Sequence, residues 1–312
     1  MGAKAKGVVV DGVMTPRRLA ALAVLSVTAI WGVTFPLNKL ALASVDPVAL
    51  TLWRFALAAV ALGVVAVLGR RRLTRTSLWA GTLSGLALAG GYVTQVEGQR
   101  FVAPALAGFL TGLSVVLVPL GVLVVGRRPT RRQLVGIAIA VLALVVLTHP
   151  QGNGSLLGVG LELACATFFA AQIVILEALD AGGDPLVVAA VQMGTIALVA
   201  AGLGPVLGVG LIPHRAGIVG WVAILYDGLG ASALAFLVQA WALAHASSVE
   251  ISVLYGAEPL FAALSSVLFG YGGLGAATLA GGMLVVVAVV VTSTPPGTLR
   301  PLLARRARRA GT

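Results

Sequence analysis

The chain is a succession of long apolar runs separated by short polar gaps. A helix that spans a membrane needs about 20 mostly apolar residues, and Gly or Pro stands in most of the gaps. The fifth run is short, and the eighth is long enough to tilt or break. We therefore predict an all-α protein with ten transmembrane helices, over residues 19–42, 47–68, 77–99, 102–125, 133–148, 157–179, 185–203, 216–244, 247–269 and 274–292.

The composition supports the membrane assignment. Of the 312 residues, 59% are hydrophobic and 10% are charged, whereas a soluble domain averages about 25% charged residues. The mean hydropathy is +1.05. The 40 glycines suit helices that pack closely in lipid.

The net charge of +11 comes from clusters of basic residues between the runs, a pattern that determines topology and does not indicate nucleic-acid binding. With ten helices, the positive-inside rule places all four clusters, 17 of the 21 basic residues, on the cytoplasmic side. Both termini are then cytoplasmic, and the expected location is a bacterial-type plasma (inner) membrane. The clusters are Lys4, Lys6, Arg17 and Arg18; Arg70, Arg71, Arg72 and Arg75; Arg127, Arg128, Arg131 and Arg132; and Arg300, Arg305, Arg306, Arg308 and Arg309.

The first run also has some features of a signal peptide. Two arginines precede it, and it ends in Ala41-Leu42-Ala43, which resembles a signal-peptidase site. However, Pro36, Asn38 and Lys39 interrupt the run just before that site. We expect the first helix to be retained.

An internal repeat relates the two halves of the chain. Asp46-Pro47 after the first run matches Asp184-Pro185 after the sixth, and at this offset Trp31 falls on Phe169 and Arg54 on Gln192. Gln99 and Gln239 each lie 20 residues before a proline, Pro119 and Pro259. Since five is odd, two five-helix halves must be inverted, as in many secondary transporters. The expected parts are a tail 1–18, repeats 19–149 and 150–292, and a basic tail 293–312.

Two cations lie inside apolar runs, where each costs about 2.5–3.5 kcal/mol at a helix centre. Lys39 can bind an anionic group of a substrate or extend to the outer interface. Arg54 can extend to the interface, but a cavity-facing or structural role is the preferred expectation. One hypothesis is that both give a central cavity a positive potential suited to a carboxylate.

Other candidates are polar or aromatic residues within the runs. Tyr92, Gln95 and Gln99 form a polar stripe on the third helix, while Trp31, Trp241 and Tyr255 can supply aromatic walls. Gln172, Gln192 and Gln239 can contact a ligand or join helices by hydrogen bonds. Asp227 lies near the middle of a long run. Glu97, Glu162, Glu177 and Asp180 lie near run ends, and we expect them to be solvated.

Three prolines, Pro36, Pro119 and Pro259, are expected to shape their helices, because each removes a backbone donor. Glu258 precedes Pro259 near the middle of the ninth run. Such an acid can carry a coupling proton or form a permanent hydrogen bond to a neighbouring helix. The sequence leaves both alternatives open.

The sequence predicts no enzymatic activity, cofactor or metal. Cys165 is the single cysteine, so no intrachain disulfide is expected, and His149, His214 and His245 lie near run ends without a cluster. We expect a secondary transporter with a small-molecule substrate, with proton coupling and oligomeric state left open. A small-molecule channel or a membrane receptor without coupled transport is the alternative.

These features resemble the EamA-type proteins of the drug/metabolite transporter superfamily. The similarity covers residues 19–292 and lies in Trp31-Gly32 with Phe35 and Lys39, Arg54-Phe55, Gln133 with Gly136, Ala231-Ser232-Ala233-Leu234, Trp241-Ala242-Leu243 and Glu258-Pro259-Leu260-Phe261-Ala262-Ala263-Leu264.

The resemblance implies ten helices in two inverted repeats, a central cavity, and export or exchange of small metabolites such as amino acids. The chain departs from the family's pattern after the fourth and ninth helices, where Gly-Glu is common. Here Arg127 follows Gly126, and Tyr271 follows Gly270.

Overall fold

The computed structural model describes residues 15–147, 155–179, 183–271 and 275–293, and this part of the chain contains helices and no strand. The predicted boundary at residues 149 and 150, almost all of both tails, His149 and Asp180 lie outside the described residues.

Each of the ten predicted runs is helical where it is described. Seven runs form single helices: α1 (Pro16–Ala41), α2 (Pro47–Leu68), α3 (Arg75–Gly98), α6 (Arg131–Leu147), α7 (Leu156–Leu179), α8 (Pro185–Val206) and α13 (Ala276–Ser293). Seven segments of the described chain are long and apolar enough to cross a membrane: α1, α2, α4–α5, α7, α8, α9–α10 and α11–α12. The chain is therefore a multi-pass membrane protein.

The repeated Asp-Pro pair starts a helix in the same way in both halves. The Asp46 carboxylate accepts a hydrogen bond from the Val48 N–H at 2.8 Å, and Asp184 accepts one from the Leu186 N–H at 3.0 Å. In each case the carboxylate caps an otherwise unpaired N–H, and the proline occupies the first helical position, where no donor is needed. The repeat thus specifies the start of α2 and of α8.

Three predicted helices are interrupted. Residues 102–125 form α4 (Pro104–Gly112) and α5 (Ser114–Val124), and residues 247–269 form α11 (Ser248–Tyr255) and α12 (Glu258–Leu268). Each remains one apolar span, with a short turn at Leu113 or at Gly256 and Ala257, where the backbone keeps right-handed helical dihedrals. The eighth run is α9 (Gly217–Leu225), a π-helical stretch η1 (Tyr226–Leu234) and α10 (Ala235–Leu243).

The prolines have three different positions. Pro259 lies in the first turn of α12, so it starts a helix. Pro119 lies inside α5. Pro36 lies inside α1, which stays helical to Ala41. The carbonyl four residues before Pro36, that of Gly32, accepts a hydrogen bond from the Ser265 hydroxyl at 2.8 Å.

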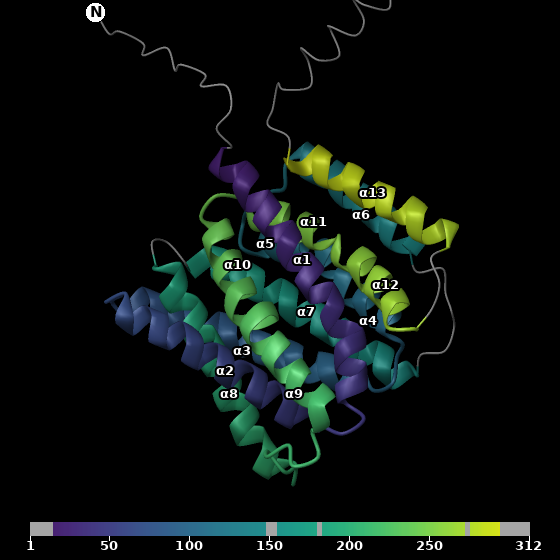
Figure 1. Cartoon of the computed structure of the whole chain (residues 1–312). Coiled ribbons are helices and arrows are strands. Elements are labelled where there is room, and N and C mark those ends of the chain that lie inside the picture. The colour runs from purple at the N-terminus through teal and green to yellow at the C-terminus, as the bar shows by residue number, and fades with distance from the viewer. Residues whose placement is uncertain (1–14, 148–154, 180–182, 272–274, 294–312) are drawn as a thin grey trace, which may run out of the picture.

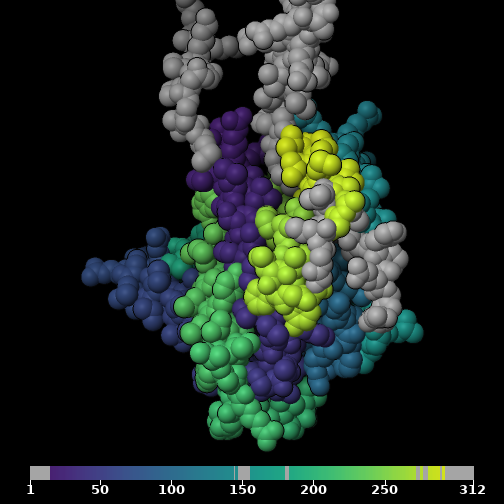
Figure 2. Space-filling model, turned by 45° about the vertical axis from the view of Figure 1, so that its right-hand side comes forward, coloured from purple at the N-terminus to yellow at the C-terminus, as the bar shows by residue number. Residues whose placement is uncertain are grey.

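Helices from the two halves interlock across the bundle. The helix α2 packs on α8, α3 on both α7 and α8, and α6 on α13 at one edge (Figure 1). Figure 2 shows α1 between α10 and α12. The start of α1 and the end of α13 lie at the same end of the bundle (Figure 1).

The crossing of α1 with α12 depends on Gly32. A Cβ atom at this position would lie 2.4 Å from the Phe261 Cβ and 2.8 Å from the backbone nitrogen of Ala262. Because backbone atoms limit the space, only glycine fits at this crossing. The close approach holds α12, and with it Glu258, against α1.

Candidate functional site

A cavity of ≈ 480 Å³ lies between the two halves. Both helix interruptions reach it, since Thr111 and Ser114 flank the first and Tyr255 and Glu258 flank the second. Eight of the predicted site residues line the cavity: Trp31, Arg54, Tyr92, Gln95, Gln172, Gln239, Tyr255 and Glu258.

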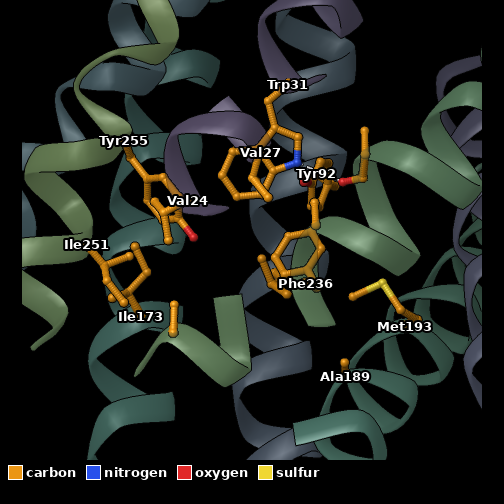
Figure 3. Packing of buried hydrophobic residues seen from close by; sticks show 14 of the residues in the cluster. Val24, Val27, Trp31, Tyr92, Ile173, Ala189, Met193, Phe236, Ile251 and Tyr255 are labelled. Atoms are coloured by element: carbon orange, nitrogen blue, oxygen red, sulfur yellow. Dashed lines mark hydrogen bonds between the residues drawn. The ribbon is translucent and has the colours of Figure 1, made fainter. Parts of the chain in front are cut away.

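Aromatic side chains form much of the wall. The Trp31 ring centroid lies 4.9 Å from that of Tyr255 and 5.5 Å from that of Phe236, and Tyr92 lies 5.0 Å from Phe169. Figure 3 shows Trp31 between Tyr255 and the pair of Tyr92 and Phe236. The Trp31 indole N–H donates to the Ala231 carbonyl in η1 at 2.7 Å. This hydrogen bond fixes Trp31 as a wall residue, away from the membrane interface.

Amides and hydroxyls provide polar positions among these rings. The Gln172 amide of α7 donates to the Gln239 amide oxygen of α10 at 3.0 Å. The Gln95 amide donates to the Thr111 hydroxyl at 3.3 Å. The Tyr255 hydroxyl is buried near Gln239 but has no hydrogen-bond partner among the described residues. An unpaired buried hydroxyl is costly, so it is a natural position for a ligand contact.

The Arg54 side chain is 2% exposed and has fixed partners. Its Nε donates to the Ser232 hydroxyl at 2.8 Å, and its Nη1 lies 3.3 Å from the Asp227 carboxylate. The guanidinium also lies over the rings of Phe55 and Tyr92, 4.9 Å and 4.5 Å from their centroids. Asp227, which does not line the cavity, therefore balances the charge that the sequence suggested for a substrate anion.

Glu258 lies at the start of α12 and faces the cavity. No hydrogen bond or ion pair joins its carboxylate to another residue in the described part of the chain. It lies close enough to Arg54 for their charges to interact. The permanent hydrogen bond that the sequence left open is thus not present in this conformation.

Lys39 is not part of the cavity wall. Its ammonium donates to the carbonyl oxygens of Gln99, Arg100 and Val102 at 2.7, 3.1 and 3.1 Å, just beyond the end of α3. A cation is favourable at a helix C-terminus. Lys39 therefore fixes the α3–α4 turn to α1, away from the cavity wall, and its extension to the outer interface stays a prediction.

Three other predicted site residues also lie outside the cavity wall. The Gln192 amide donates to the Ser84 hydroxyl at 2.9 Å and joins α8 to α3. The Gln99 side chain is buried without a hydrogen-bond partner among the described residues. Trp241, in the last turn of α10, packs on His245 just beyond the end of the helix, with centroids 4.8 Å apart. Trp241 is therefore not an aromatic wall residue.

The sequence interpretation missed several polar and aromatic wall residues and one buried acid. Glu162 was expected to be solvated, but it is fully buried and accepts a hydrogen bond from Thr111 at 3.3 Å. Glu162 is the seventh residue of α7. Its burial could not be predicted from the sequence, because a single sequence does not show which side of a helix faces a neighbouring helix. The missed polar and aromatic wall residues are Thr34, Thr111, Ser114, Phe169 and Phe236.

Polar contacts join helix ends at the side predicted to be cytoplasmic. Arg17 pairs with Glu250, and Arg127 lies 3.3 Å from Glu177. The backbone N–H and the hydroxyl of Ser248 also donate to the Glu177 carboxylate. The expectation that Glu177 is simply solvated was therefore wrong, whereas Glu97 is exposed and pairs with Arg100 as a surface charge.

The geometry contains no arrangement typical of a metal centre. No group of three or more His, Cys, Asp or Glu side chains that could hold a metal ion occurs in the described ranges.

Comparisons with known proteins agree on one family. The model of the EamA-like transporter family matches the chain twice, at residues 18–149 and 156–294. An uncharacterized transporter of Archaeoglobus fulgidus is 27% identical over 278 residues, which cover 89% of this chain and 86% of the relative. A crystal structure whose description names no function matches with a TM-score of 0.70 at 22% sequence identity. The matched region covers 88% of this chain and 97% of the chain in that structure. The chain belongs to the EamA-like transporter family, within the drug/metabolite transporter superfamily, and is a membrane transporter.

Proposed function

We propose that the protein is a secondary transporter that moves small metabolites, amino-acid-like or drug-like molecules, across a bacterial-type plasma membrane by alternating access. The direction is export or exchange, and the protein has no catalytic activity. The observation that carries the proposal is the cavity between the halves, lined by aromatic rings, paired amides and Glu258.

Three observations support an architecture of two inverted five-helix repeats, 19–149 and 150–292, with both tails cytoplasmic. The family model matches each half separately. Packing pairs also recur under exchange of the halves: α3 with α7 corresponds to α1 with α10, α3 with α8 to α2 with η1, and α1 with α12 to α5 with α7. Helix ends that are predicted to lie on the same side of the membrane also contact each other. One example is the ion pair of Arg71 with Asp184.

The two interruptions suit a transport site. Discontinuous helices at a repeat interface are a common feature of transporter substrate sites. Here α4–α5 and α11–α12 are both interrupted next to the cavity. Glu258, at the start of α12, is our candidate for a coupling proton because its carboxylate is buried and has no fixed partner.

The test begins with the purified protein in a thermal-shift screen against amino acids, nucleosides and drugs, followed by uptake of the stabilising compounds into liposomes. Tyr255→Phe removes the unpaired hydroxyl and should weaken binding. Thr167→Val is the control, since Thr167 is exposed on α7 and bonds only to the Leu163 carbonyl. Binding without any uptake would favour a receptor, and high unitary conductance would favour a channel.

The proton role of Glu258 has its own test. Glu258→Gln keeps the shape of the side chain but cannot titrate. In liposomes this variant should bind substrate but lose accumulation driven by a pH gradient. Full gradient-driven accumulation by the variant would exclude the role.

A further inference from the structure

Glu162 is a buried acid that the transport proposal does not use. Its side chain is 0% exposed, and it lies in the second turn of α7 against α3 and α4. Gly98 makes room for it, because a Cβ atom on Gly98 would lie 3.1 Å from the Glu162 Oε1. Oε2 accepts from the Thr111 hydroxyl at 3.3 Å, whereas Oε1 has no partner among the described residues.

No cation among the described residues forms an ion pair with this carboxyl group. The titratable groups that interact with it are Glu258 from α12 and Cys165 from its own helix. Its recorded contacts on α3 and α4 are Gly98 and the Thr111 hydroxyl, neither of which is charged.

The remaining neighbours of α7 are too far along the helix to compensate Glu162. The helices α5 and α11 contact α7 nearer its other end, at Val174 and Glu177. At the end of α3, Glu97 and Arg100 pair with each other at the surface. An isolated ionised carboxylate is very costly in an apolar interior, so such a group takes up a proton instead.

A short hydrogen-bonded path joins Glu162 to the cavity. Gln95 and Thr111 both line the cavity, and the Gln95 amide donates to the hydroxyl that in turn donates to Glu162. Thr111 is therefore the single residue between the acid and the substrate space. Glu258 lines the same cavity, whereas Glu162 lies behind Thr111 and does not line it.

A metal ion fits this position poorly. Hard cations bind several oxygen ligands at once, and the Glu162 carboxylate has one oxygen contact, Thr111, among the described residues. A proton needs only the carboxyl group itself.

We propose that Glu162 is a second proton-binding site, which exchanges its proton with the central cavity through the Thr111 hydroxyl. This inference rests on the proposed transport function, because water and protons must reach the cavity during the cycle. Glu162 then supplies a proton in addition to any that Glu258 carries.

Infrared difference spectroscopy tests the site without a substrate. The purified protein, in liposomes of phosphatidylethanolamine and phosphatidylglycerol, is moved from acidic to alkaline buffer. The C=O band of a protonated carboxyl group should be present in acid and lost in alkali, and Glu162→Gln should lack one component of that change. Glu97→Gln removes an exposed, paired carboxylate and should leave the change intact.

Thr111→Val keeps the test valid if Glu162→Gln does not fold. It leaves Glu162 in place and removes its hydrogen-bond partner, so the Glu162 component should shift in frequency. In Glu258→Gln, the pH range over which the Glu162 component is lost should change, because the two acids interact.

Three results would overturn the proposal. A Glu162→Gln spectrum identical to the wild type would mean that Glu162 does not titrate. A Thr111→Val spectrum with no shifted component would remove the path to the cavity. Loss of the component on replacing potassium by sodium at constant pH would indicate a metal cation site. Since no substrate is present, these outcomes are separate from those of the uptake assay.

Discussion

The second helix of each half carries a polar residue at the matching position, but the two residues differ in charge. Arg54 of α2 reaches across to η1, where it bonds to Ser232 and pairs with Asp227. Gln192 of α8 reaches across to α3, where it bonds to Ser84. Each half thus holds the other through one buried polar side chain, once as an ion pair and once as a neutral hydrogen bond.

This difference shows that two halves with the same helix arrangement can have charged side chains in one half and neutral ones at the matching positions of the other. Glu258 has no acidic counterpart in the first half, since Val118 stands at the matching position. Charge is therefore concentrated in the contact of α2 with η1 and at the start of α12. The contact of α8 with α3 contains a neutral hydrogen bond instead of an ion pair.

The largest expected effect is on topology, and it tests whether the two halves are inverted. Reporter fusions after Arg75, Arg132 and Ala304 should report the cytoplasm, because the basic clusters are retained on that side. A fusion near Gly152 should report the outside. A cytoplasmic signal at Gly152 would make the halves parallel and would end the comparison between matched helices.

The next prediction compares how much the charged contact of Arg54 and the neutral contact of Gln192 contribute to the free energy of unfolding. Arg54→Met should lower the free energy of unfolding by about 3–5 kcal/mol, because it leaves Asp227 buried and unpaired. Arg54→Met with Asp227→Leu should recover much of this loss. Gln192→Leu should cost far less. Equal losses from Arg54→Met and Gln192→Leu in unfolding measurements would contradict the assignment of the two contacts.

Removing one hydroxyl group at a time compares the hydrogen bonds that Arg54 and Gln192 form with their serine partners. Ser232→Ala removes a hydrogen bond from a charged donor and should cost about 1.5–3 kcal/mol. Ser84→Ala removes a neutral interhelical bond, typically about 0.6 kcal/mol. The same unfolding assay measures both variants, and a larger cost for Ser84→Ala would reverse the comparison.

Another prediction concerns the place where α1 crosses α12. Gly32→Ala introduces the residue that the second half has at the matching position, Ala170, and should cost about 1–3 kcal/mol through overpacking against Phe261. Gly194→Ala is the control, because no atom lies within 4 Å of its added Cβ. A stable Gly32→Ala protein with unchanged unfolding would show that the crossing can widen freely.

The sequence predicted the features that depend on local patterns. Apolar run length gave the helical segments, and the Asp-Pro pairs marked two helix starts because a carboxylate cap followed by proline acts within one turn. Eight of the predicted site residues line the cavity because polar and aromatic side chains inside apolar runs tend to face the bundle interior.

Features that depend on distant contacts were not visible. Arg54 and Asp227 are 173 residues apart, and nothing near either residue indicates the pairing. The same holds for Lys39, whose partners are backbone carbonyls that no side-chain pattern reveals. The interruption at Leu113 also has no clear local signal, since Pro119 lies inside α5, beyond the break.

The most direct test of the central claim, alternating access around the cavity, locks the side that is predicted to be cytoplasmic. In a Cys165→Ala background, Arg17→Cys and Glu250→Cys place two thiols where α1 and α11 are now joined by an ion pair. Ser114→Cys adds a thiol in the cavity wall. Oxidation should stop transport and should allow a membrane-impermeant thiol reagent to reach the cavity from the outside only, and reduction should restore both transport and access from the cytoplasm. Undiminished transport by the oxidised protein, or cavity labelling from the cytoplasmic side, would contradict alternating access.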